Sequence, residues 1–316
     1  MKKIHFTKMH GAGNDYVYVD LFQEELPAAP EKLAPIIADR HFGVGGDGLV
    51  LICPSDIADA RMRMFNLDGS ESEMCGNAIR CVAKYVAERK TPRPDRLRVA
   101  TGAGVLALDC YYDAAKEKVE RVRVDMGKPI LNPSDVPTTL RGEGEGRPVL
   151  DLPVKELGLN FSSALGADSD ALRAFESSPL CCVSMGNPHC VVFVDAITDA
   201  LVTSCGPIIE RSLVNFPKRV NVEFIERVSN TELKMRVWER GSGETLACGT
   251  GACASTVAAI LTGRADKRVR VHLRGGDLEI EWDESSGDVF MTGPAVEVFT
   301  GVLDEGILAQ LERSNE

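Results

Sequence analysis

The stretch that decides the fold is ERGSGETLACGTGAC, residues 239–253. It follows a strand-like run at 233–238, passes through a glycine-rich turn, and enters a helix whose side chains from 252 to 261 are all apolar or small. A helix that is apolar all round is typical of a buried position. Cys248 falls in the first turn, where unpaired N–H groups and the helix dipole favour an anion. The pattern predicts a buried helix with a cysteine at its start.

Taken alone, Cys248 has two interpretations: a reactive thiol biased toward thiolate, or a small core residue. A second copy of the stretch decides between them. NLDGSESEMCG, residues 66–76, also follows a strand-like run and leads into a helix. Cys75 and Cys248 lie 173 residues apart, and the same offset separates Asn66 from Glu239 and the Gly-Asn pair at 13–14 from the pair at 186–187. An ordered series at one offset indicates a duplicated domain.

The duplication divides the chain into two repeats, each read as strands wrapped about one helix. We expect a first domain at 1–130, which contains Cys75, and a second at 131–299, which contains Cys248. Residues 300–316 are expected to pack back on the first domain. The turn-rich, acidic segment at 131–179 breaks the symmetry, and we interpret it as a linker and surface excursion with a short helix near 168–175.

Bulk composition is that of a soluble globular protein. At 316 residues, with 44% apolar and 26% charged residues, the chain can bury two cores. No run approaches the roughly 20 apolar residues of a membrane span, and no apolar leader stands at the N-terminus. A net charge of −11 argues against nucleic-acid binding. Ten cysteines in such a chain indicate reduced thiols, so we expect a cytoplasmic protein without nucleic-acid or membrane partners.

Cofactor sites are not indicated. GVGGDG at 43–48 matches the dinucleotide pattern, but a helix precedes it and a strand follows, the reverse of the required order. There is no CxxC pair, and His189 and Cys190, adjacent in a strand, would point to opposite faces, so no metal is expected. Pyridoxal phosphate would need an activated lysine and a phosphate cradle, and neither can be identified. We therefore expect no cofactor.

Two matched cysteines suggest a specific reaction. If the two domains face each other, Cys75 and Cys248 lie on opposite walls of one cleft. Inverting a stereocentre by proton transfer needs such a pair, because one thiolate removes the α-proton and the opposing thiol protonates the other face. The thiol pKa, about 8.5 in reference peptides, can be lowered at a helix start. N–H groups at the two helix starts can bind a substrate carboxylate as charge builds up on it.

The motifs together resemble one known family. MHGAGND (9–15), NLDGS (66–70) running to MCGN (74–77), GNPHC (186–190), RVNV (219–222) and ERG (239–241) running to ACGTG (247–251) are similar to those of diaminopimelate epimerases. The resemblance extends over about residues 6–294. It implies interconversion of LL- and meso-2,6-diaminopimelate without cofactor or metal, in lysine and peptidoglycan-precursor synthesis. It also implies an α/β (α+β) fold of two pseudo-symmetric domains, each a curled, mostly antiparallel β-sheet or barrel around a central helix.

The resemblance also assigns roles residue by residue. Cys75 and Cys248 would be the acid–base pair, and His189 and Glu239 would tune their pKa values. Substrate binding falls to a larger polar set: Asn14, Asn66, Asn187, Asn221, Glu239 and Arg240 chiefly for the distal amino and carboxylate groups, and Gly76, Asn77, Gly249 and Thr250 for the reacting carboxylate. These types suit a zwitterion, since arginine binds a carboxylate in a fork and glutamate binds an ammonium.

Two positions depart from the family pattern. Gly48 stands where some relatives carry a substrate-contacting glutamine, and Ala78 replaces a glycine common after Cys-Gly-Asn. The first change would remove a contact or leave it to the backbone, and the second would shift the first helical turn slightly. The segment at 131–179 is also expected to be longer than is usual in the family. None of these departures removes a catalytic group.

Other functions fit part of the pattern. A two-thiol racemase of proline, hydroxyproline or histidine would share the cysteines, but it would not use the Glu239-Arg240 pair and the four asparagines. A non-catalytic amino-acid binder would not need cysteines at both helix starts, and a dithiol redox protein would favour CxxC. The expected partner is thus a small amino-acid substrate. The sequence leaves the oligomeric state open, and a homodimer is the assembly we consider.

Overall fold

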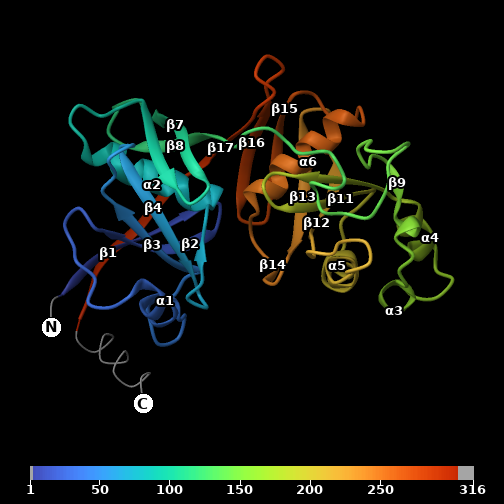
Figure 1. The fold of residues 1–316 in the computed structure, drawn as a ribbon, viewed down its shortest axis with the longest axis horizontal. Helices are drawn as coiled ribbons and strands as arrows, with labels where there is room; N and C mark the ends of the chain where they lie inside the picture. Colours follow the sequence, from blue (N-terminus) through green and yellow to red (C-terminus); the bar gives the residue numbers. More distant parts are fainter. Residues whose placement is uncertain (1–2, 305–316) are drawn as a thin grey trace. The chain divides into compact units, whose positions relative to one another are not determined.

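A computed structural model describes residues 3–304 of the chain, and these residues form two compact units (Figure 1). Among the described residues, the first unit comprises residues 3–125 and 292–304, and the second comprises Met126–Met291. The sequence-based domains, 1–130 and 131–299, remain predictions. The predicted return of 300–316 to the first domain falls mostly on residues beyond 304, outside those described.

The first unit is a mixed sheet with two helices. Its elements in chain order are β1 (Ile4–Gly11), β2 (Asn14–Asp20), α1 (Pro30–Ala38), β3 (Gly48–Cys53), β4 (Ala60–Asn66), β5 (Glu71–Ser72), α2 (Gly76–Arg89), β6 (Arg96–Thr101), β7 (Gly104–Tyr112), β8 (Val119–Asp125) and β18 (Val296–Leu303). Neighbouring strands are antiparallel except for the parallel pairs β2–β3 and β4–β6. Nearly every position of β3 is buried, and α1 packs against the strand. This explains why its sequence, GLVLIC, is apolar throughout instead of alternating.

Helix α2 is the centre of the first unit. It packs against β1, β2, β4, β6, β7 and β8, so the sheet curls around it (Figure 1). Its predicted apolar stripe is buried: Ile79, Val82, Ala83 and Val86 are at most 7% exposed. A smaller core lies on the other side of the sheet, where Leu33 and Ile37 of α1 pack against the strands.

The second unit repeats this order of elements. They are β10 (Pro179–Ser184), β11 (Pro188–Val194), η2 (Ala200–Cys205), α5 (Gly206–Glu210), β12 (Asn221–Arg227), β13 (Glu232–Glu239), β14 (Gly243–Glu244), α6 (Gly249–Leu261), β15 (Arg268–Leu273), β16 (Gly276–Trp282) and the first half of β17 (Val289–Pro294), whose residues from Thr292 on are part of the first unit. Helix α6 packs against β10, β11, β12, β15 and β16. It is buried from Gly251 to Ala259, as predicted, but its last residue, Leu261, is 37% exposed.

Strand pairing confirms the duplication. Six pairs in the first unit have a counterpart of the same sense in the second: β11–β12 is parallel like β2–β3, and β13–β15 is parallel like β4–β6. The antiparallel pairs β10–β11, β12–β13, β13–β14 and β15–β16 match β1–β2, β3–β4, β4–β5 and β6–β7. The predicted fold class, two pseudo-symmetric units with a curled sheet around a central helix, is confirmed.

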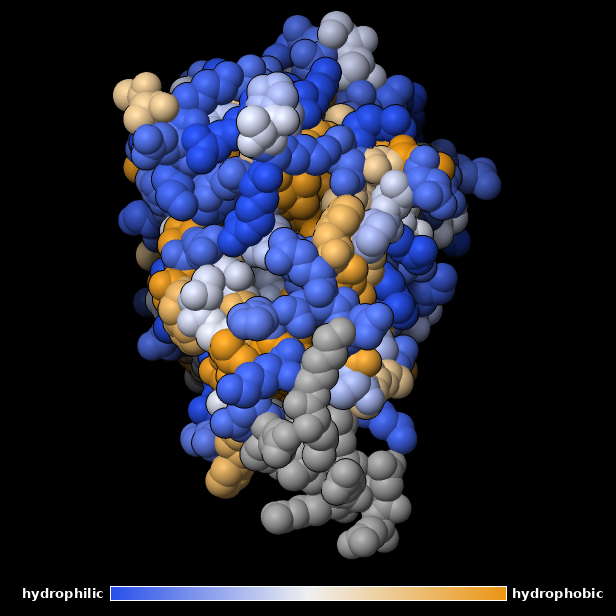
Figure 2. Space-filling view, turned by 90° about the vertical axis from the view of Figure 1, so that its left-hand side faces the viewer, coloured by the Kyte–Doolittle hydropathy of each residue, from blue (hydrophilic) through white to orange (hydrophobic). Residues whose placement is uncertain are grey.

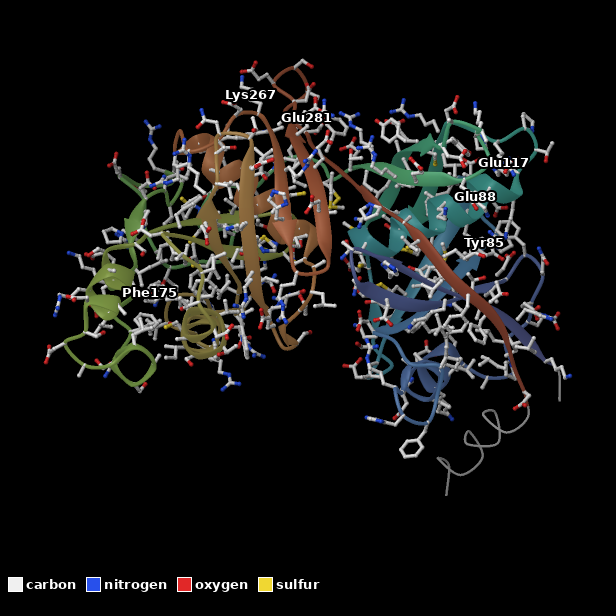
Figure 3. All side chains as sticks on the ribbon, turned by 180° about the vertical axis from the view of Figure 1, so that it is seen from behind. Tyr85, Glu88, Glu117, Phe175, Lys267 and Glu281 are labelled. Atoms are coloured by element: carbon white, nitrogen blue, oxygen red, sulfur yellow. The ribbon has the colours of Figure 1, made fainter. Side chains whose placement is uncertain are left out.

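The segment before β10 differs from its prediction as a surface excursion. It forms β9 (Leu152–Pro153), η1 (Val154–Leu157), α3 (Ser162–Leu165) and α4 (Asp170–Ser177), which Ser169 caps by accepting a hydrogen bond from Leu172 N at 3.0 Å. Phe161 and Phe175, the latter labelled in Figure 3, are at most 3% exposed and pack edge to face in the core of the second unit. The predicted helix is present, but the segment also covers part of the second sheet, because its apolar side chains need a partner.

The surface is mainly hydrophilic, with scattered apolar side chains. Figure 2 shows this on a face of the first unit. On β18, which pairs with β1, Val298, Phe299 and Val302 are between 46% and 53% exposed. No helix within residues 3–304 has the length and hydropathy that crossing a bilayer would require.

A buried ion pair fixes the second half of α2. Lys84 and Glu88, the latter labelled in Figure 3, lie off the apolar stripe, yet their side chains are only 8% and 5% exposed, because β8 packs against α2. Glu88 accepts hydrogen bonds from Lys84 Nζ and from Val119 N, both at 2.7 Å. Burial alone would raise the pKa of the Glu88 carboxyl, but these hydrogen bonds and the lysine charges hold it below its ordinary value.

This ion pair makes stability depend on pH. We expect Glu88→Gln to lower the free energy of unfolding by about 2 kcal/mol at pH 7, because it leaves the Lys84 ammonium buried without its counter-charge. The folded-state pKa is lowered, so the stabilisation is complete above the ordinary glutamate pKa of about 4.3 and is lost as pH falls through the lowered value.

Urea unfolding followed by circular dichroism at pH 7 and pH 3 measures the effect. The difference between Glu88→Gln and the unchanged protein should shrink at pH 3, whereas the exposed Glu117→Gln should behave as the unchanged protein at both values. A difference that is equal at the two pH values would show that the glutamate charge is not what stabilises this end of α2.

Candidate active site

Each of the two matched cysteines caps the helix at the centre of its unit. Cys75 precedes α2 with φ −139° and ψ 118°, and Cys248 precedes α6 with φ −119° and ψ 107°. Both backbones are extended, and both carbonyls already accept the first helical hydrogen bond, from Ile79 N and Ala252 N at 3.0 Å. A short strand and a turn lead into each helix start, so the repeated sequence produces a repeated geometry.

The two sulfur atoms differ in their surroundings. Cys75 is half-buried, whereas Cys248 is 6% exposed. Sγ of Cys248 accepts a hydrogen bond from Gly251 N at 3.4 Å and lies 3.5 Å from Thr250 Oγ1. Burial, together with the carboxylates of Glu239 and Glu223, nevertheless raises the pKa of the Cys248 thiol well above its ordinary value. The expectation that the helix start lowers this pKa is wrong for Cys248, because burial outweighs the hydrogen bonds.

Asn14 lies beside Cys75 at the start of β2. Its Oδ1 accepts from the thiol at 3.4 Å, and its Nδ2 donates to Asp47 Oδ2 at 2.6 Å. Asp47 is in turn bound by Arg40 Nη2 at 2.9 Å, and Arg40 also binds Asp15. This chain of charged groups holds the Asn14 amide in a fixed orientation toward the sulfur.

The other predicted residues of the first unit lie around the same helix start. Asn66 ends β4 and donates through Nδ2 to Ser70 Oγ at 3.0 Å. Gly76 and Asn77 form the first turn of α2, where the fully buried Arg80 donates to Gly76 O and to Asn77 Oδ1, both at 2.9 Å. The helix start is therefore braced from within by an arginine.

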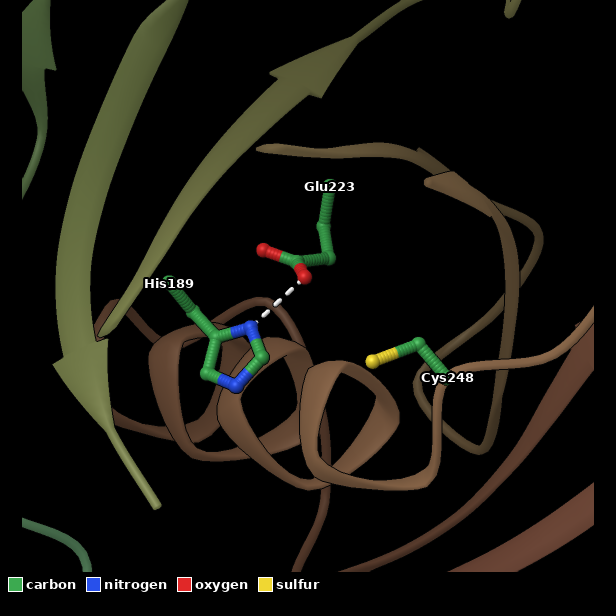
Figure 4. A group of neighbouring side chains, drawn as sticks. All are labelled: His189, Glu223 and Cys248. Atoms are coloured by element: carbon green, nitrogen blue, oxygen red, sulfur yellow. Dashed lines mark hydrogen bonds and ion pairs between the residues drawn. The ribbon is translucent and has the colours of Figure 1, made fainter. Parts of the chain in front are cut away.

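In the second unit the predicted residues form a chain of hydrogen bonds toward Cys248. Nδ2 of Asn187 donates to Thr250 Oγ1 at 3.2 Å, and Oδ1 of Asn187 lies 3.0 Å from His189 Nε2. The other ring nitrogen, Nδ1, lies 2.7 Å from Glu223 Oε1 (Figure 4). His189 and Glu223 are both 0% exposed. Parallel pairing of β11 with β12 places both side chains on the face that meets α6.

The end of β13 completes the group. Glu239 accepts a hydrogen bond from the Thr245 hydroxyl, and its charge contributes to the raised pKa of Cys248. Asn221 Oδ1 accepts from the backbone N–H of Arg240 at 2.8 Å, and the guanidinium of Arg240 donates to the carbonyl of Lys218 at 3.0 Å. Thus each unit gathers its own share of the predicted residues around its own cysteine.

One group in the described residues has the composition of a metal site. His189, Glu223 and Cys248 present nitrogen, oxygen and sulfur atoms within 4.8 Å of one another (Figure 4). However, the histidine and the glutamate already use a ring nitrogen and an oxygen to bind each other at 2.7 Å. We therefore interpret the group as a hydrogen-bonded chain that ends at a thiol.

The two departures from the family pattern have structural correlates. A Cβ at position 48 would lie 2.0 Å from Phe65 O and 2.9 Å from the Tyr16 ring, so this backbone admits only glycine there. A glutamine cannot replace Gly48 without moving β3 away from β4. Ala78 is fully buried in the first turn of α2, whose helical hydrogen bonds begin normally at Ile79.

Several residues of the site were not identified from the sequence. Glu223 and Arg80 are single charged residues between apolar neighbours, in Val-Glu-Phe and Ile-Arg-Cys. A charge in such a run predicts a buried side chain with a partner, and this pattern would have identified both residues. Asp47 sits in the glycine-rich segment that was weighed only as a nucleotide motif. Its contact with Asn14 joins residues 33 apart, which no local pattern encodes.

The fold places the chain in a known structural class. The structure matches a phenazine biosynthesis protein of the PhzF family from Bacillus anthracis with a TM-score of 0.67 at 17% sequence identity. The match covers 96% of this chain and 100% of that protein. It also matches a probable proline racemase from Agrobacterium radiobacter K84 with a TM-score of 0.63 at 15% identity, covering 96% of this chain and 93% of that one. The class is therefore the two-repeat α/β fold that these proteins share.

Within that class the sequence identifies the family. The diaminopimelate epimerase family model matches residues 6–132 and 181–298, which leaves the segment before β10 unmatched. A diaminopimelate epimerase from Agathobacter rectalis is 51% identical over 300 residues, which cover 95% of this chain and 99% of that protein. One from Moorella thermoacetica is 48% identical over 298 residues, 94% of this chain and 98% of that protein. The chain belongs to the diaminopimelate epimerase family.

The unequal surroundings of the two sulfurs predict unequal reactivity. We expect iodoacetamide at pH 8 to alkylate Cys75 at least tenfold faster than Cys248, because Cys248 is nearly inaccessible and its thiol pKa is raised. The buried Cys181 and Cys205, whose thiol pKa values burial raises to about 12, should remain unmodified in the folded protein.

Peptide mapping by mass spectrometry after a timed reaction measures these rates. Complete alkylation in urea provides the control that every cysteine peptide is detectable. If Cys248 reacted first, its burial and its carboxylate neighbours would not govern its chemistry in solution.

Proposed function

We propose that this chain interconverts LL- and meso-2,6-diaminopimelate by moving a proton at one α-carbon, in the synthesis of lysine and of peptidoglycan precursors. One observation carries the proposal: a cysteine stands at the start of the central helix in each of two equivalent units, in a chain of the diaminopimelate epimerase family. A reaction that inverts a stereocentre is the chemistry that uses such a pair.

The mechanism is a two-base proton transfer. One cysteine acts as a thiolate and takes the α-proton on one face, and the other acts as a thiol and delivers its proton to the opposite face. One S–H bond forms as the C–H bond breaks, and one S–H bond breaks as the new C–H bond forms. The two thiols exchange protonation states, so the enzyme is ready for the reverse reaction. We assign these roles to Cys75 and Cys248.

The negative charge of the intermediate spreads onto the α-carboxylate. Gly249 and Thr250 begin α6, and Gly76 and Asn77 begin α2, where backbone N–H groups point out of the helix. We assign these four residues to that carboxylate, because donors at a helix start gain strength as the carboxylate becomes more negative. The reaction then needs no electron sink, so we propose that it proceeds without a cofactor or metal.

The polar residues at the ends of β4 and β13, at the starts of β2 and β12 and just before β11 would select the substrate. Glu239 and Arg240 can bind an ammonium and a carboxylate, the groups at the distal end of diaminopimelate. The amides of Asn14, Asn66, Asn187 and Asn221 would supply hydrogen bonds to the same end. Proline and hydroxyproline lack such a distal zwitterion, and these residues would have no role with them.

Two further assignments remain proposals. We propose a cytoplasmic location, since all ten cysteines are free thiols and a reducing compartment preserves such a set. We propose a homodimer, for which β18 offers exposed apolar side chains such as that of Val302.

Isotope exchange at the α-carbon tests the reaction. In deuterated water, LL-diaminopimelate should gain deuterium at one α-carbon as it converts to the meso form. Cys75→Ala and Cys248→Ala should each lower the rate by at least about a thousandfold, because each removes one acid–base group. Cys205→Ala, at a buried thiol away from both helix starts, is the matched control and should remain active if it folds.

The same assay identifies the substrate and the bases. Deuterium incorporation into proline and not into diaminopimelate would contradict the substrate assignment. Full epimerase activity in either of the two alanine variants at the helix starts would contradict the two-thiol mechanism.

A further inference from the structure

Glu223 has no role in the reaction as derived above, yet it is the most buried carboxylate near either thiol. Its side chain is 0% exposed, and its Oε1 lies 2.7 Å from Nδ1 of the equally buried His189. Position 251 must be glycine for this approach, because a Cβ there would lie 2.6 Å from Glu223 Oε1 and 3.2 Å from Cys248 Sγ. A buried carboxylate held this closely needs a positive or donating partner.

The hydrogen bonds beyond His189 connect this carboxylate to the sulfur. They run from His189 Nε2 to Asn187, from Asn187 to Thr250 Oγ1, and from Thr250 Oγ1 to Cys248 Sγ, with lengths of 3.0, 3.2 and 3.5 Å. Each of these links can run in either direction: the ring nitrogen and the hydroxyl can donate or accept, and the amide can rotate to exchange its two ends. The chain therefore has two complete arrangements.

In the first arrangement every donor between His189 Nε2 and Cys248 points toward the sulfur. His189 carries protons on both nitrogens, Nδ1–H donates to Glu223 and Nε2–H donates to the Asn187 oxygen. The Asn187 amide then donates to Thr250, and the Thr250 hydroxyl donates to a Cys248 thiolate. In the second arrangement the thiol donates to Thr250 and the chain reverses, with a neutral ring that accepts at Nε2. The two arrangements differ in the position of one proton, on Sγ of Cys248 or on Nε2 of His189.

We propose that Glu223 is a positioning residue that holds His189 so that its ring takes the proton of Cys248 when the thiolate is required. The proposal rests on the proposed function, in which Cys248 is an acid–base group. Proton exchange with solvent suffices to move between the two arrangements, and the Asn187 amide only reorients. The Glu223 carboxylate stabilises the doubly protonated ring by direct contact at 2.7 Å.

The carboxylate also repels the thiolate, and magnitudes decide which effect prevails. Coulomb energy falls with distance, and Glu223 is in hydrogen-bond contact with the ring but not with the sulfur. The stabilisation of the protonated ring should therefore exceed the repulsion of the thiolate. Glu239 at the end of β13 also acts on the sulfur, and its charge raises the thiol pKa, whereas the buried thiol of Cys190 lies on the opposite face of β11, in the apolar core.

The rate of Cys248 alkylation as a function of pH tests the proposal without substrate. Glu223→Gln keeps the shape and removes the charge, so we expect the midpoint of the Cys248 profile to move up by about one pH unit. At a fixed pH below the midpoint, this is a roughly tenfold slower reaction. Cys75 in the same molecule should keep its profile, and Glu226→Gln, three residues along β12, should change neither.

A second pair of variants gives the opposite sign. With His189→Gln as the background, no ring can take the proton and only the repulsion between Glu223 and the sulfur remains. Adding Glu223→Gln to that background should then move the midpoint down. If Glu223→Gln alone fails to fold, Glu223→Asp keeps the charge but withdraws it from the ring, and a smaller upward movement is expected.

The outcomes separate this proposal from the proposed function. A downward or unchanged midpoint in the single Glu223 variants would overturn the positioning role, whatever the epimerase activity. If the Glu223 variants lose the exchange with diaminopimelate that the unchanged protein shows, and their Cys248 midpoint moves up as predicted, the positioning role is supported. If the unchanged protein shows no exchange with diaminopimelate, an upward movement of the Cys248 midpoint in the Glu223 variants would still support the positioning role. That result would count against the proposed reaction alone.

Discussion

The structure depends on one constraint, the placement of a cysteine at the N-terminal cap of a helix that is enclosed by a curled sheet. The helix start supplies directed N–H groups, and the enclosure keeps water away from them. The strand and turn before each helix fix the cysteine backbone in an extended conformation, so the sulfur stays beside the first turn. Because the chain builds this arrangement twice, it presents two cysteines in the same local geometry, which the proposed reaction uses as its acid–base pair.

The two copies share a fold but not an environment. Cys75 is half-buried beside an asparagine held by charged residues, whereas Cys248 is buried beside carboxylates and a histidine. The proposed reaction does not require identical surroundings, since in it the two thiols would act in turn as base and acid. The glutamate–histidine pair at β11 and β12 gives the more buried thiol a place for its proton, which burial otherwise holds on the sulfur.

Much of this arrangement could be predicted from the sequence. The 173-residue offset predicted the duplicated fold, and the apolar run after Cys248 predicted the buried helix α6. The direction in which the pKa of the Cys248 thiol shifts was not predictable, because it depends on burial by segments that are distant in the sequence. The segment before β10 was taken for a surface excursion, since its acidic turns mask apolar residues such as Phe161 and Phe175 that pack only in three dimensions. The contacts of Glu223 and Asp47 likewise join separate strands and loops.

The central claim is that Cys75 and Cys248 act on a single carbon atom, which requires their sulfurs to approach each other in solution. Mild oxidation of the substrate-free protein measures this directly, since a two-electron oxidant can join two thiols only if they meet. The account predicts one Cys75–Cys248 disulfide by peptide mass mapping, with activity lost in proportion and restored by reductant. Loss of activity with neither cysteine modified, or a disulfide that never joins this pair, would contradict it.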